Sequence, residues 1–449
     1  MDRILLLNGL VVNEGRRTEV DLLVTGGRVE RIGGDLSAVR ADILIDASGK
    51  FVLPGLIDDQ VHFREPGLTH KGDIASESRA AVAGGVTSFL DMPNTQPPTT
   101  TSERLEEKYA IAAGTSHANF GFYFGATNDN IEAIKALNPR RACGLKVFMG
   151  ASSGDILVDS PKALEAIFRD SPVLIATHCE DTPTIKENER KFRELYGEAI
   201  PMHCHPLIRS EKACFKSSSL AVDLAQRYGS RLHLLHLSTA PELALLSRAP
   251  LTEKRITAEA CVHHLYFETS DYEGKGALIK CNPAIKTQAD REALRRSVVD
   301  GSIDVIGTDH APHALCEKQG SYFTVCAGLP LVQHALCLLW ELYSQGIFPL
   351  ELIVEKTSHA VARLFAIKER GFVREGYWAD LVVVDPKSET AVTPMSVLYK
   401  CGWSPFGGHT FPCSIDTTIV SGQIAYHRGV VDEQVLGRCL EFGNEGTFG

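Results

Sequence analysis

The 449-residue sequence lacks any Cys-x-x-Cys pair and any apolar run of about 20 residues, and it has no excess of basic residues. Its 12 cysteines stand singly, which argues against a structural zinc site made of cysteines and indicates reduced thiols. No run is long enough to cross a bilayer, and the N-terminus MDRILLLNGLVVNEG lacks the basic start and long apolar core of a signal peptide. The net charge of -10 disfavours nucleic acid as a partner. We therefore expect a cytoplasmic protein with no membrane segment.

The composition, 44% hydrophobic and 23% charged, is that of an ordinary globular chain. Its length suits one large domain and a smaller one. Both ends read as short apolar runs joined by Asn-Gly, Gly-Gly and Ser-Gly turns, with no helical period between them. Because chain termini often meet, we expect residues 1–53 and 368–449 to form one small β-sandwich domain.

The middle of the chain alternates nearly all-apolar runs with amphipathic helical stretches. The apolar runs include VTSFLDMP, GLKVFMG, VLIATHCE, RLHLLHLS, ITAEACVHHLYF and DVIGTDHAPH. This alternation predicts a parallel sheet covered by helices. About eight such units favour a closed (β/α)₈ TIM barrel over residues 54–367. A doubly wound open sheet is the alternative, and the absence of G-x-G-x-x-G after the first strand weakens it.

Polar side chains gather where the predicted barrel strands end, the position at which barrels carry their chemistry. A lone histidine at a strand end is more often a hydrogen-bonding residue than a metal ligand, and Cys179 alone indicates packing. The joint pattern is what matters, because several strands deliver metal-capable groups to the same end. The residues are Asp58, Gln60, His62, Arg64, Asp91, Asn94, Lys146, His178, His236, His263, His264, Asp309, His310 and His313.

Imidazole and carboxylate donors without thiolates suit zinc or a similar divalent ion that keeps an open water position. Such an ion lowers the pKa of its water and polarises a carbonyl group. Asp309 would then carry the proton of the attacking water. Arg64 shares the face of His62 and would hold a substrate carboxylate through two parallel hydrogen bonds, with help from Asn94. The residues alone therefore indicate metal-assisted hydrolysis of an amide-like bond in a small acidic substrate.

These motifs resemble the amidohydrolase superfamily, and within it the cyclic amidases. PGLIDDQVHFREPG is similar to the first-strand D-x-H-x-H motif, and DMPNT, GLKVF, THCED, HLST, KCNPAIK and TDHAPH follow in family order. GYWADLVVVDP and SPFGG in the tail also match, so the resemblance covers nearly the whole chain. The H-x-R-E-P-G form, with Arg64, is the dihydroorotase pattern. Allantoinases and hydantoinases usually have another residue at that position.

The resemblance implies a barrel with a β-sandwich and a two-zinc centre bridged by a lysine that has reacted with CO₂, matched by Lys146. His178 and His236 match the ligands of one zinc, and His62 and Asp309 match those of the other. Asp309 also matches the catalytic residue. The positions that bind substrate in the family are matched here by Arg64, Asn94, Asn282 and His313. The implied reaction is the reversible cyclisation of N-carbamoyl-L-aspartate to L-dihydroorotate in pyrimidine biosynthesis.

Gln60 departs from the family pattern, which has a histidine ligand there. An amide oxygen is a weaker zinc donor than imidazole, so we expect one firmly held zinc and a second that is loose or absent. Two other functions stay open: another cyclic amidase, against which Arg64 and Asn282 argue, and an inactive scaffold, supported by Gln60 alone. The superfamily resemblance also suggests a homo-oligomer. Residues 314–326 are a candidate segment to close over the substrate.

Overall fold

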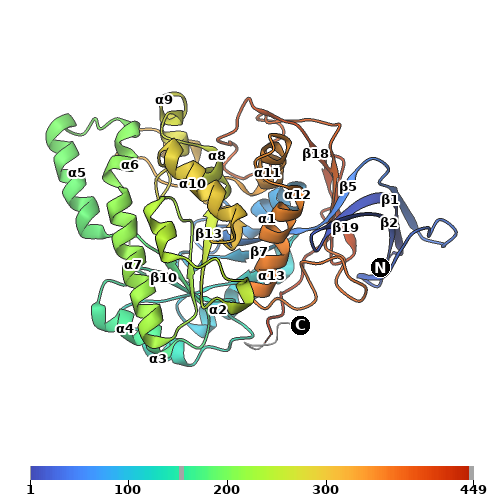
Figure 1. The fold of residues 1–449 in the computed structure, drawn as a ribbon, viewed down its shortest axis with the longest axis horizontal. Helices are drawn as coiled ribbons and strands as arrows, with labels where there is room; N and C mark the ends of the chain where they lie inside the picture. Colours follow the sequence, from blue (N-terminus) through green and yellow to red (C-terminus); the bar gives the residue numbers. More distant parts are fainter. Residues whose placement is uncertain (1, 151–155, 444–449) are drawn as a thin grey trace.

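The computed structural model describes residues 2–150 and 156–443. Two regions lie side by side, a barrel of parallel strands wrapped by helices and a β-rich region that contains the N-terminus (Figure 1). Figure 1 shows the blue N-terminal strands against the orange and red C-terminal ones, so both ends of the chain build the β-rich region. The prediction of a TIM barrel with a small β-sandwich domain from both termini is confirmed as a barrel and a β-rich region.

The barrel strands are nearly all apolar and buried, as strands covered on both faces must be. β8 pairs with β7, and β9 pairs with β10, so the two short segments on either side of Tyr123 act as one interrupted strand. Val61 pairs in parallel with His310, and this bridge closes the ring. The barrel strands are β6 (Leu56–Val61), β7 (Val86–Asp91), β8 (Asn119–Phe122), β9 (Phe124–Gly125), β10 (Leu145–Phe148), β11 (Ile175–His178), β12 (Leu232–Leu234), β13 (Ile256–Cys261) and β14 (Val305–Gly307).

Helices cover the outside of the barrel (Figure 1), and their ends follow local sequence signals. Asp73 caps the first helix through the backbone N–H of Ser76, and Thr287 caps a later one through Asp290. Gly229 ends the longest helix with φ of 67°, a conformation that suits glycine. The helices are α1 (Ile74–Ala83), α2 (Ser102–Thr115), α3 (Ile131–Lys135), α4 (Pro161–Asp170), α5 (Thr182–Tyr196), α6 (His205–Ile208), α7 (Glu211–Tyr228), α8 (Val262–Tyr266), α9 (Asp271–Lys275), α10 (Gln288–Val299), α11 (Ala335–Ser344), α12 (Leu350–Val354) and α13 (Ala360–Leu364).

The β-rich region is a nine-stranded, mostly antiparallel sheet that joins the two ends of the chain. β5 pairs with both β1 and β15, so a strand from the start of the chain binds one from the end. Its strands are β1 (Ile4–Asn13), β2 (Arg16–Thr25), β3 (Arg28–Gly33), β4 (Ile43–Asp46), β5 (Phe51–Pro54), β15 (Leu381–Asp385), β18 (Ser414–Val420), β19 (Gln423–His427) and β20 (Val430–Val431). A separate two-stranded ladder pairs β16 (Thr390–Ala391) with β17 (Thr410–Phe411).

One run differs from its sequence prediction. ITAEACVHHLYF was expected to be a single strand, but β13 ends at Cys261 and α8 begins at Val262. The prediction was wrong because the histidines of this run belong to a short helix, whose one turn cannot be told from an apolar strand by periodicity. Within residues 2–150 and 156–443, no helix combines the length and apolar character needed to cross a bilayer.

Candidate active site

One cavity of about 210 Å³ lies at the carboxyl ends of the barrel strands. Every residue that the sequence proposed as catalytic, metal-binding or substrate-binding lines it, together with Gln60. The lining residues that carry chemistry are Gln60, His62, Arg64, Asn94, Lys146, His178, His236, Asn282, Asp309 and His313. The structure therefore brings together groups that lie up to about 250 residues apart in sequence, while their individual roles stay predictions.

Three of these residues hold a left-handed backbone conformation that residues other than glycine rarely adopt. Arg64 has φ of 69°, His236 of 39° and Asp309 of 50°. Each follows the end of a barrel strand. Left-handed φ in a residue other than glycine costs free energy and tends to persist at functional sites, where the surrounding structure fixes it. Here the turn aims each side chain into the cavity.

One wall of the cavity is built by His62, Asn94, Asp309 and Gln60. His62 donates from Nδ1 to Asn94 Oδ1 at 2.6 Å, since an amide oxygen can only accept. Its Nε2 then faces Asp309 Oδ1 at 3.0 Å. Burial lowers the pKa of His62, which favours a neutral ring with a lone pair at Nε2. A lone pair and a carboxylate at this distance are suited to a shared cation.

Gln60 lies on this same wall and contacts Asp309. Its Nε2 donates to Asp309 Oδ1 at 3.0 Å, while its Oε1 is buried with no hydrogen-bond partner among the described residues. The amide therefore holds the aspartate and also offers one oxygen.

The opposite wall presents two neutral imidazoles. His178 donates from Nε2 to Glu180 Oε2 at 3.0 Å, which leaves its Nδ1 facing His236 Nε2 at 3.0 Å. Burial lowers the pKa of both histidines. Arg209 pairs with Glu180, whose pKa is held at about 2 by Arg209 and His178 against the opposing effect of burial. Glu180 thus stays ionised and fixes the tautomer of His178, as carboxylates do behind histidine ligands.

Lys146 projects from β10 between these walls. Its side chain is buried, and burial lowers the pKa of its ammonium to about 8. A lysine with a lowered pKa has a larger share of neutral amine, the form that reacts with CO₂. The donor set of imidazoles, a carboxylate and a carboxylatable lysine therefore fits a divalent metal.

The other end of the cavity is cationic. Arg64 donates from Nε to Pro312 O at 3.1 Å, and its Nη2 lies 3.2 Å from His313 Nε2. Lys71 approaches His313 Nδ1 at 3.1 Å and pairs with Glu317 at 2.9 Å. Arg64 is 7% exposed, and among the described residues no carboxylate forms an ion pair with its guanidinium. A buried guanidinium without an anion is costly, so this end is prepared for an anionic ligand.

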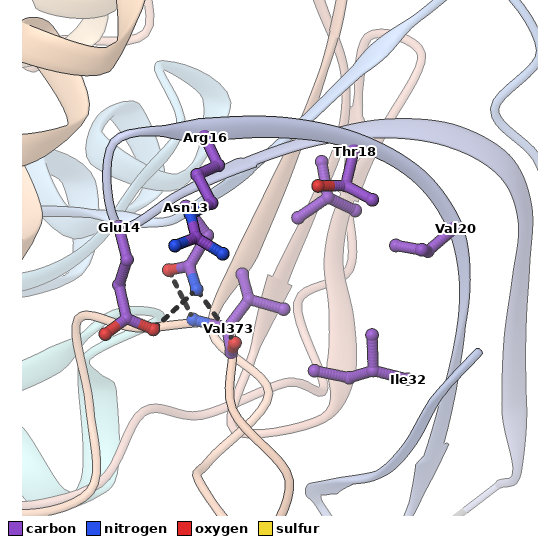
Figure 2. A pocket seen from close by; sticks show the side chains of 8 residues that line it. Asn13, Glu14, Arg16, Thr18, Val20, Ile32 and Val373 are labelled. Carbon is purple, nitrogen blue, oxygen red and sulfur yellow. Dashed lines mark hydrogen bonds between the residues drawn. The ribbon is translucent and has the colours of Figure 1, made fainter. Parts of the chain in front are cut away.

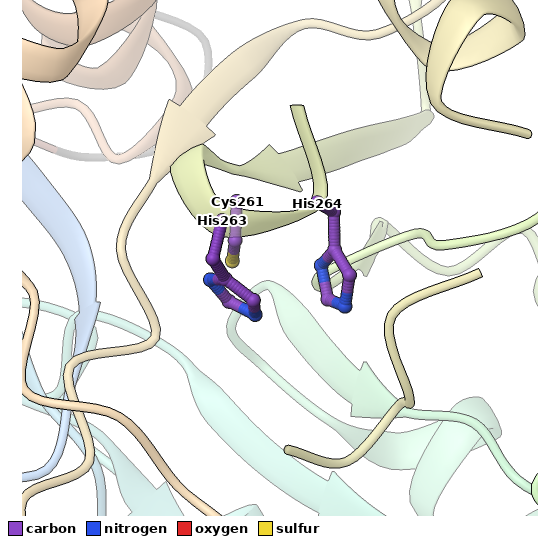
Figure 3. A group of neighbouring side chains, drawn as sticks. All are labelled: Cys261, His263 and His264. Atoms are coloured by element: carbon purple, nitrogen blue, oxygen red, sulfur yellow. The ribbon is translucent and has the colours of Figure 1, made fainter. Parts of the chain in front are cut away.

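Five residues that the sequence placed at strand ends do not line the cavity. One of them, Asp58, accepts a hydrogen bond from the hydroxyl of Thr308 at 2.5 Å. Asp91 accepts from the backbone N–H of Phe63 at 2.7 Å and pairs with buried Lys108, and His310 contacts Glu77 at 2.8 Å. His263 and His264 instead group with Cys261, with ligand atoms within 4.8 Å of one another (Figure 3). These residues belong to the buried surroundings of the site.

A larger hollow lies in the β-rich region, and two of its polar side chains, Asn13 and Glu14, are already paired. Its volume is about 530 Å³, and Asn13, Glu14, Arg16 and Val373 are among its lining residues (Figure 2). Asn13 exchanges two hydrogen bonds of 3.0 Å with the backbone of Val373, and Glu14 pairs with Arg374 at 2.6 Å. We therefore place the chemistry in the smaller barrel cavity, where buried donors and acceptors converge and where Gln60 Oε1, His236 Nδ1 and Asn282 Oδ1 have no hydrogen-bond partner among the described residues.

The sequence reasoning missed three residues that support the site. Glu180 stands in the THCED run but was not assigned a role there, although a carboxylate two residues after a ligand histidine suits orientation of that histidine. Arg209 and Lys71 carried no local signal, because only the fold brings them beside Glu180 and His313.

Comparison of the sequence and the structure with known proteins shows which family the chain resembles. Residues 51–425 match the model of the Amidohydrolase family. The chain belongs to the amidohydrolase family. A dihydroorotase of Halobacterium salinarum is 33% identical over 427 residues, which cover 93% of this chain and 95% of that protein. An allantoinase of Bacillus velezensis is 31% identical, covering 93% and 92% of the two chains.

Among solved structures, the L-hydantoinase (dihydropyrimidinase) of Arthrobacter aurescens superposes on this amidohydrolase with a TM-score of 0.93. It is 27% identical and covers 98% of this chain and 100% of its own. The relatives support an enzyme that hydrolyses cyclic amides. Because dihydroorotase, allantoinase and hydantoinase match at similar identity, the comparisons leave the substrate of this amidohydrolase open.

Proposed function

We propose that this amidohydrolase is a zinc-dependent dihydroorotase, which interconverts N-carbamoyl-L-aspartate and L-dihydroorotate and thereby serves pyrimidine biosynthesis. The observation that carries the proposal is the buried guanidinium of Arg64, which lines the cavity and has no carboxylate partner within residues 2–150 and 156–443. Dihydroorotate has a cyclic amide for one end of the cavity and a carboxylate for the other.

The alternatives fit this cationic end less well. Hydantoin and allantoin are cyclic amides without a carboxylate, and neither would neutralise Arg64. Asn94 Oδ1 accepts from His62, and in the described part of the chain neither Asn94 Nδ2 nor the buried Oδ1 of Asn282 has a hydrogen-bond partner. These groups supply the amide donors and acceptor that a carboxylate and a ring N–H require.

His62, Lys146, His178, His236 and Asp309 would hold the metal, with Lys146 carboxylated. The metal supplies Lewis acidity toward the ring carbonyl and an acidified water at neutral pH. Gln60 would offer only its Oε1, so we propose that the position beside His62 binds metal more weakly than the one beside His178 and His236.

Asp309 would move the proton in both directions. In hydrolysis it takes a proton from the attacking water, the C–N bond of the ring amide breaks, and the proton passes to the departing nitrogen. In cyclisation the nitrogen of the carbamoyl group attacks the side-chain carboxyl carbon, and Asp309 returns the proton to the departing oxygen as water is lost. The hydrogen bond from Gln60 to Asp309 Oδ1 orients the carboxylate for this transfer.

Turnover assays in both directions test the proposal. Protein purified without chelators should convert dihydroorotate and carbamoyl-aspartate to the same equilibrium mixture, and zinc removal should abolish both rates. Preferential hydrolysis of allantoin or hydantoin would favour the alternative amidases. Metal-loaded protein that turns over none of these compounds would instead favour an inactive scaffold.

A further inference from the structure

A second polar cluster lies inside the barrel, one layer deeper than the cavity. It consists of Asp59 on β6, His233 on β12 and Glu259 on β13, and all three side chains are fully buried. Asp59 and His233 each lie three residues before a cavity residue, His62 and His236. On the far side, the ring of Phe365 contacts His233 and Tyr123, each at 6.0 Å between ring centroids. The cluster is therefore sealed between the cavity and the opposite end of the barrel.

Four atoms of this cluster have no hydrogen-bond partner among the described residues. They are both carboxylate oxygens of Asp59, Oε2 of Glu259 and Nε2 of His233. Two buried carboxylates with unpartnered oxygens carry a large desolvation cost unless a cation or protons compensate them. The three side chains converge, because one ligand atom of each residue lies within 4.8 Å of those of the other two.

The hydrogen bonds around His233 decide which of its nitrogens is available. The hydroxyl of Thr257 donates to Leu232 O, so its oxygen accepts from His233 Nδ1–H at 2.9 Å. In the neutral form of the ring the lone pair therefore lies on Nε2, which faces Asp59 Oδ2 at 3.3 Å. Histidines that bind metals have this arrangement: one ring nitrogen faces the metal, and the N–H of the other donates to a neighbouring group.

The backbone opposite the carboxylates leaves room for them. Gly307 ends β14 beside the cluster, and a Cβ atom there would lie 2.8 Å from Asp59 Oδ1 and 3.1 Å from Glu259 Cδ. Any larger residue at position 307 would displace both carboxylates.

We propose that Asp59, His233 and Glu259 form a second, buried site for a divalent cation of the zinc or manganese class. The donors are four atoms from one imidazole and two carboxylates, a set that suits these ions, and a charge of +2 balances the carboxylates. A metal with bonds of about 2.1 Å holds tetrahedral ligands about 3.4 Å apart, and the 3.3 Å between Asp59 Oδ2 and His233 Nε2 agrees with that spacing.

This ion would stand directly behind the cavity. Glu259 Oε1 accepts from the backbone N–H of His236 at 3.2 Å and from the thiol of Cys261 at 2.7 Å. One carboxylate would therefore bind the buried ion and fix the left-handed turn that presents His236 to the cavity. The inference concerns metal binding alone and does not depend on which cyclic amide the enzyme hydrolyses.

Anomalous X-ray scattering from crystals of the full chain, purified without chelators and supplied with zinc or manganese, tests the site directly. We expect a peak between Asp59, His233 and Glu259, separate from any peak beside His178 and His236. Absence of that peak, with Asp59 still beside His233 in the electron density, would overturn the proposal in favour of carboxylates that share protons.

A pair of variants gives a second measurement in solution. Glu259→Gln removes one charged donor and should lower the total bound metal by about one ion per chain. Glu242→Gln is the matched control, because Glu242 is equally buried but its oxygens accept from Ser218 at 2.6 Å and Thr239 at 2.7 Å. An equal metal content in both variants and the unmodified chain would contradict the site. The crystallographic test on the unmodified chain decides the question if Glu259→Gln does not fold.

Discussion

The two ends of the active-site cavity are built from opposite kinds of group. At one end, burial favours the neutral rings of His62, His178 and His236, and hydrogen bonds to Asn94 and Glu180 decide which nitrogen of His62 and of His178 faces the cavity. At the other end, Arg64 and Lys71 surround His313 with N–H donors. The first end offers lone pairs to a cation, and the second offers hydrogen bonds to an anion.

The difference teaches how one small cavity can select its substrate. A ligand that satisfies both ends needs a group for a metal to polarise and a carboxylate at a fixed distance from it. The metal end would meet the first requirement in any cyclic amidase, whereas Arg64 would meet the second under the proposed function. Changes at the two ends should therefore have separable effects, on metal content and rate at one end and on KM at the other.

Lys146→Ala should have the largest effect, because it removes the proposed bridge at the metal end. We expect loss of metal and a fall in kcat/KM of about 10³-fold or more, since a bound metal contributes several kcal/mol to the transition state. Acetate or propionate added to the variant should restore part of both. Full metal content and full rate in Lys146→Ala would rule out the bridge.

Arg64→Lys should affect the cationic end of the cavity alone. Lysine keeps the charge but loses the planar pair of donors, and one lost charge-assisted hydrogen bond of about 1.5–3 kcal/mol raises KM for both substrates by about 10–100-fold. Metal content should stay unchanged. Arg190→Lys, on the exposed face of α5, is the control. An unaltered KM in Arg64→Lys would remove this residue from substrate binding.

Gln60→His should test whether the two metal positions bind zinc with unequal affinity. Replacement of the amide by an imidazole should raise total zinc by up to one ion per chain relative to the unmodified protein, because even changes behind the ligands shift metal affinity about 10–100-fold. Metal analysis after dialysis measures the difference. No increase, with two equally tight zincs already present in the cavity of the unmodified protein, would show that Gln60 replaces histidine fully.

The smallest expected effect is a change in how the free energy of unfolding depends on pH in acid. Burial lowers the pKa of His264 to about 4, so between pH 6.5 and 4 the unfolded chain binds a proton that the folded chain does not. Stability should therefore fall as the pH falls through this window, by an order of 1–3 kcal/mol for this residue. His264→Gln should flatten the slope in urea unfolding measured from pH 7 to 4. An identical slope in both proteins would show that groups other than His264 cause the loss of stability in acid.

The sequence alone was enough to predict the barrel and the cavity residues. Strand ends in a parallel barrel meet at one edge, so Arg64, Lys146 and Asp309 could be placed together without coordinates. It was not enough for His263 and His264, whose short helix resembles a strand in its apolar pattern. Nor did it indicate Asp59, because its partners His233 and Glu259 come from distant strands and show no spacing that a motif could reveal.

The most direct test of the account compares dihydroorotate with dihydrouracil, the same ring without the carboxylate, on one metal-loaded preparation. If Arg64 selects the carboxylate, kcat/KM should favour dihydroorotate by about 10²–10⁴-fold, the value of two charge-assisted hydrogen bonds. The same ratio in Arg64→Lys should be at least about tenfold smaller. Equal kcat/KM for the two rings in the unmodified protein would contradict the account, because the cationic end would then contribute nothing to the choice of substrate.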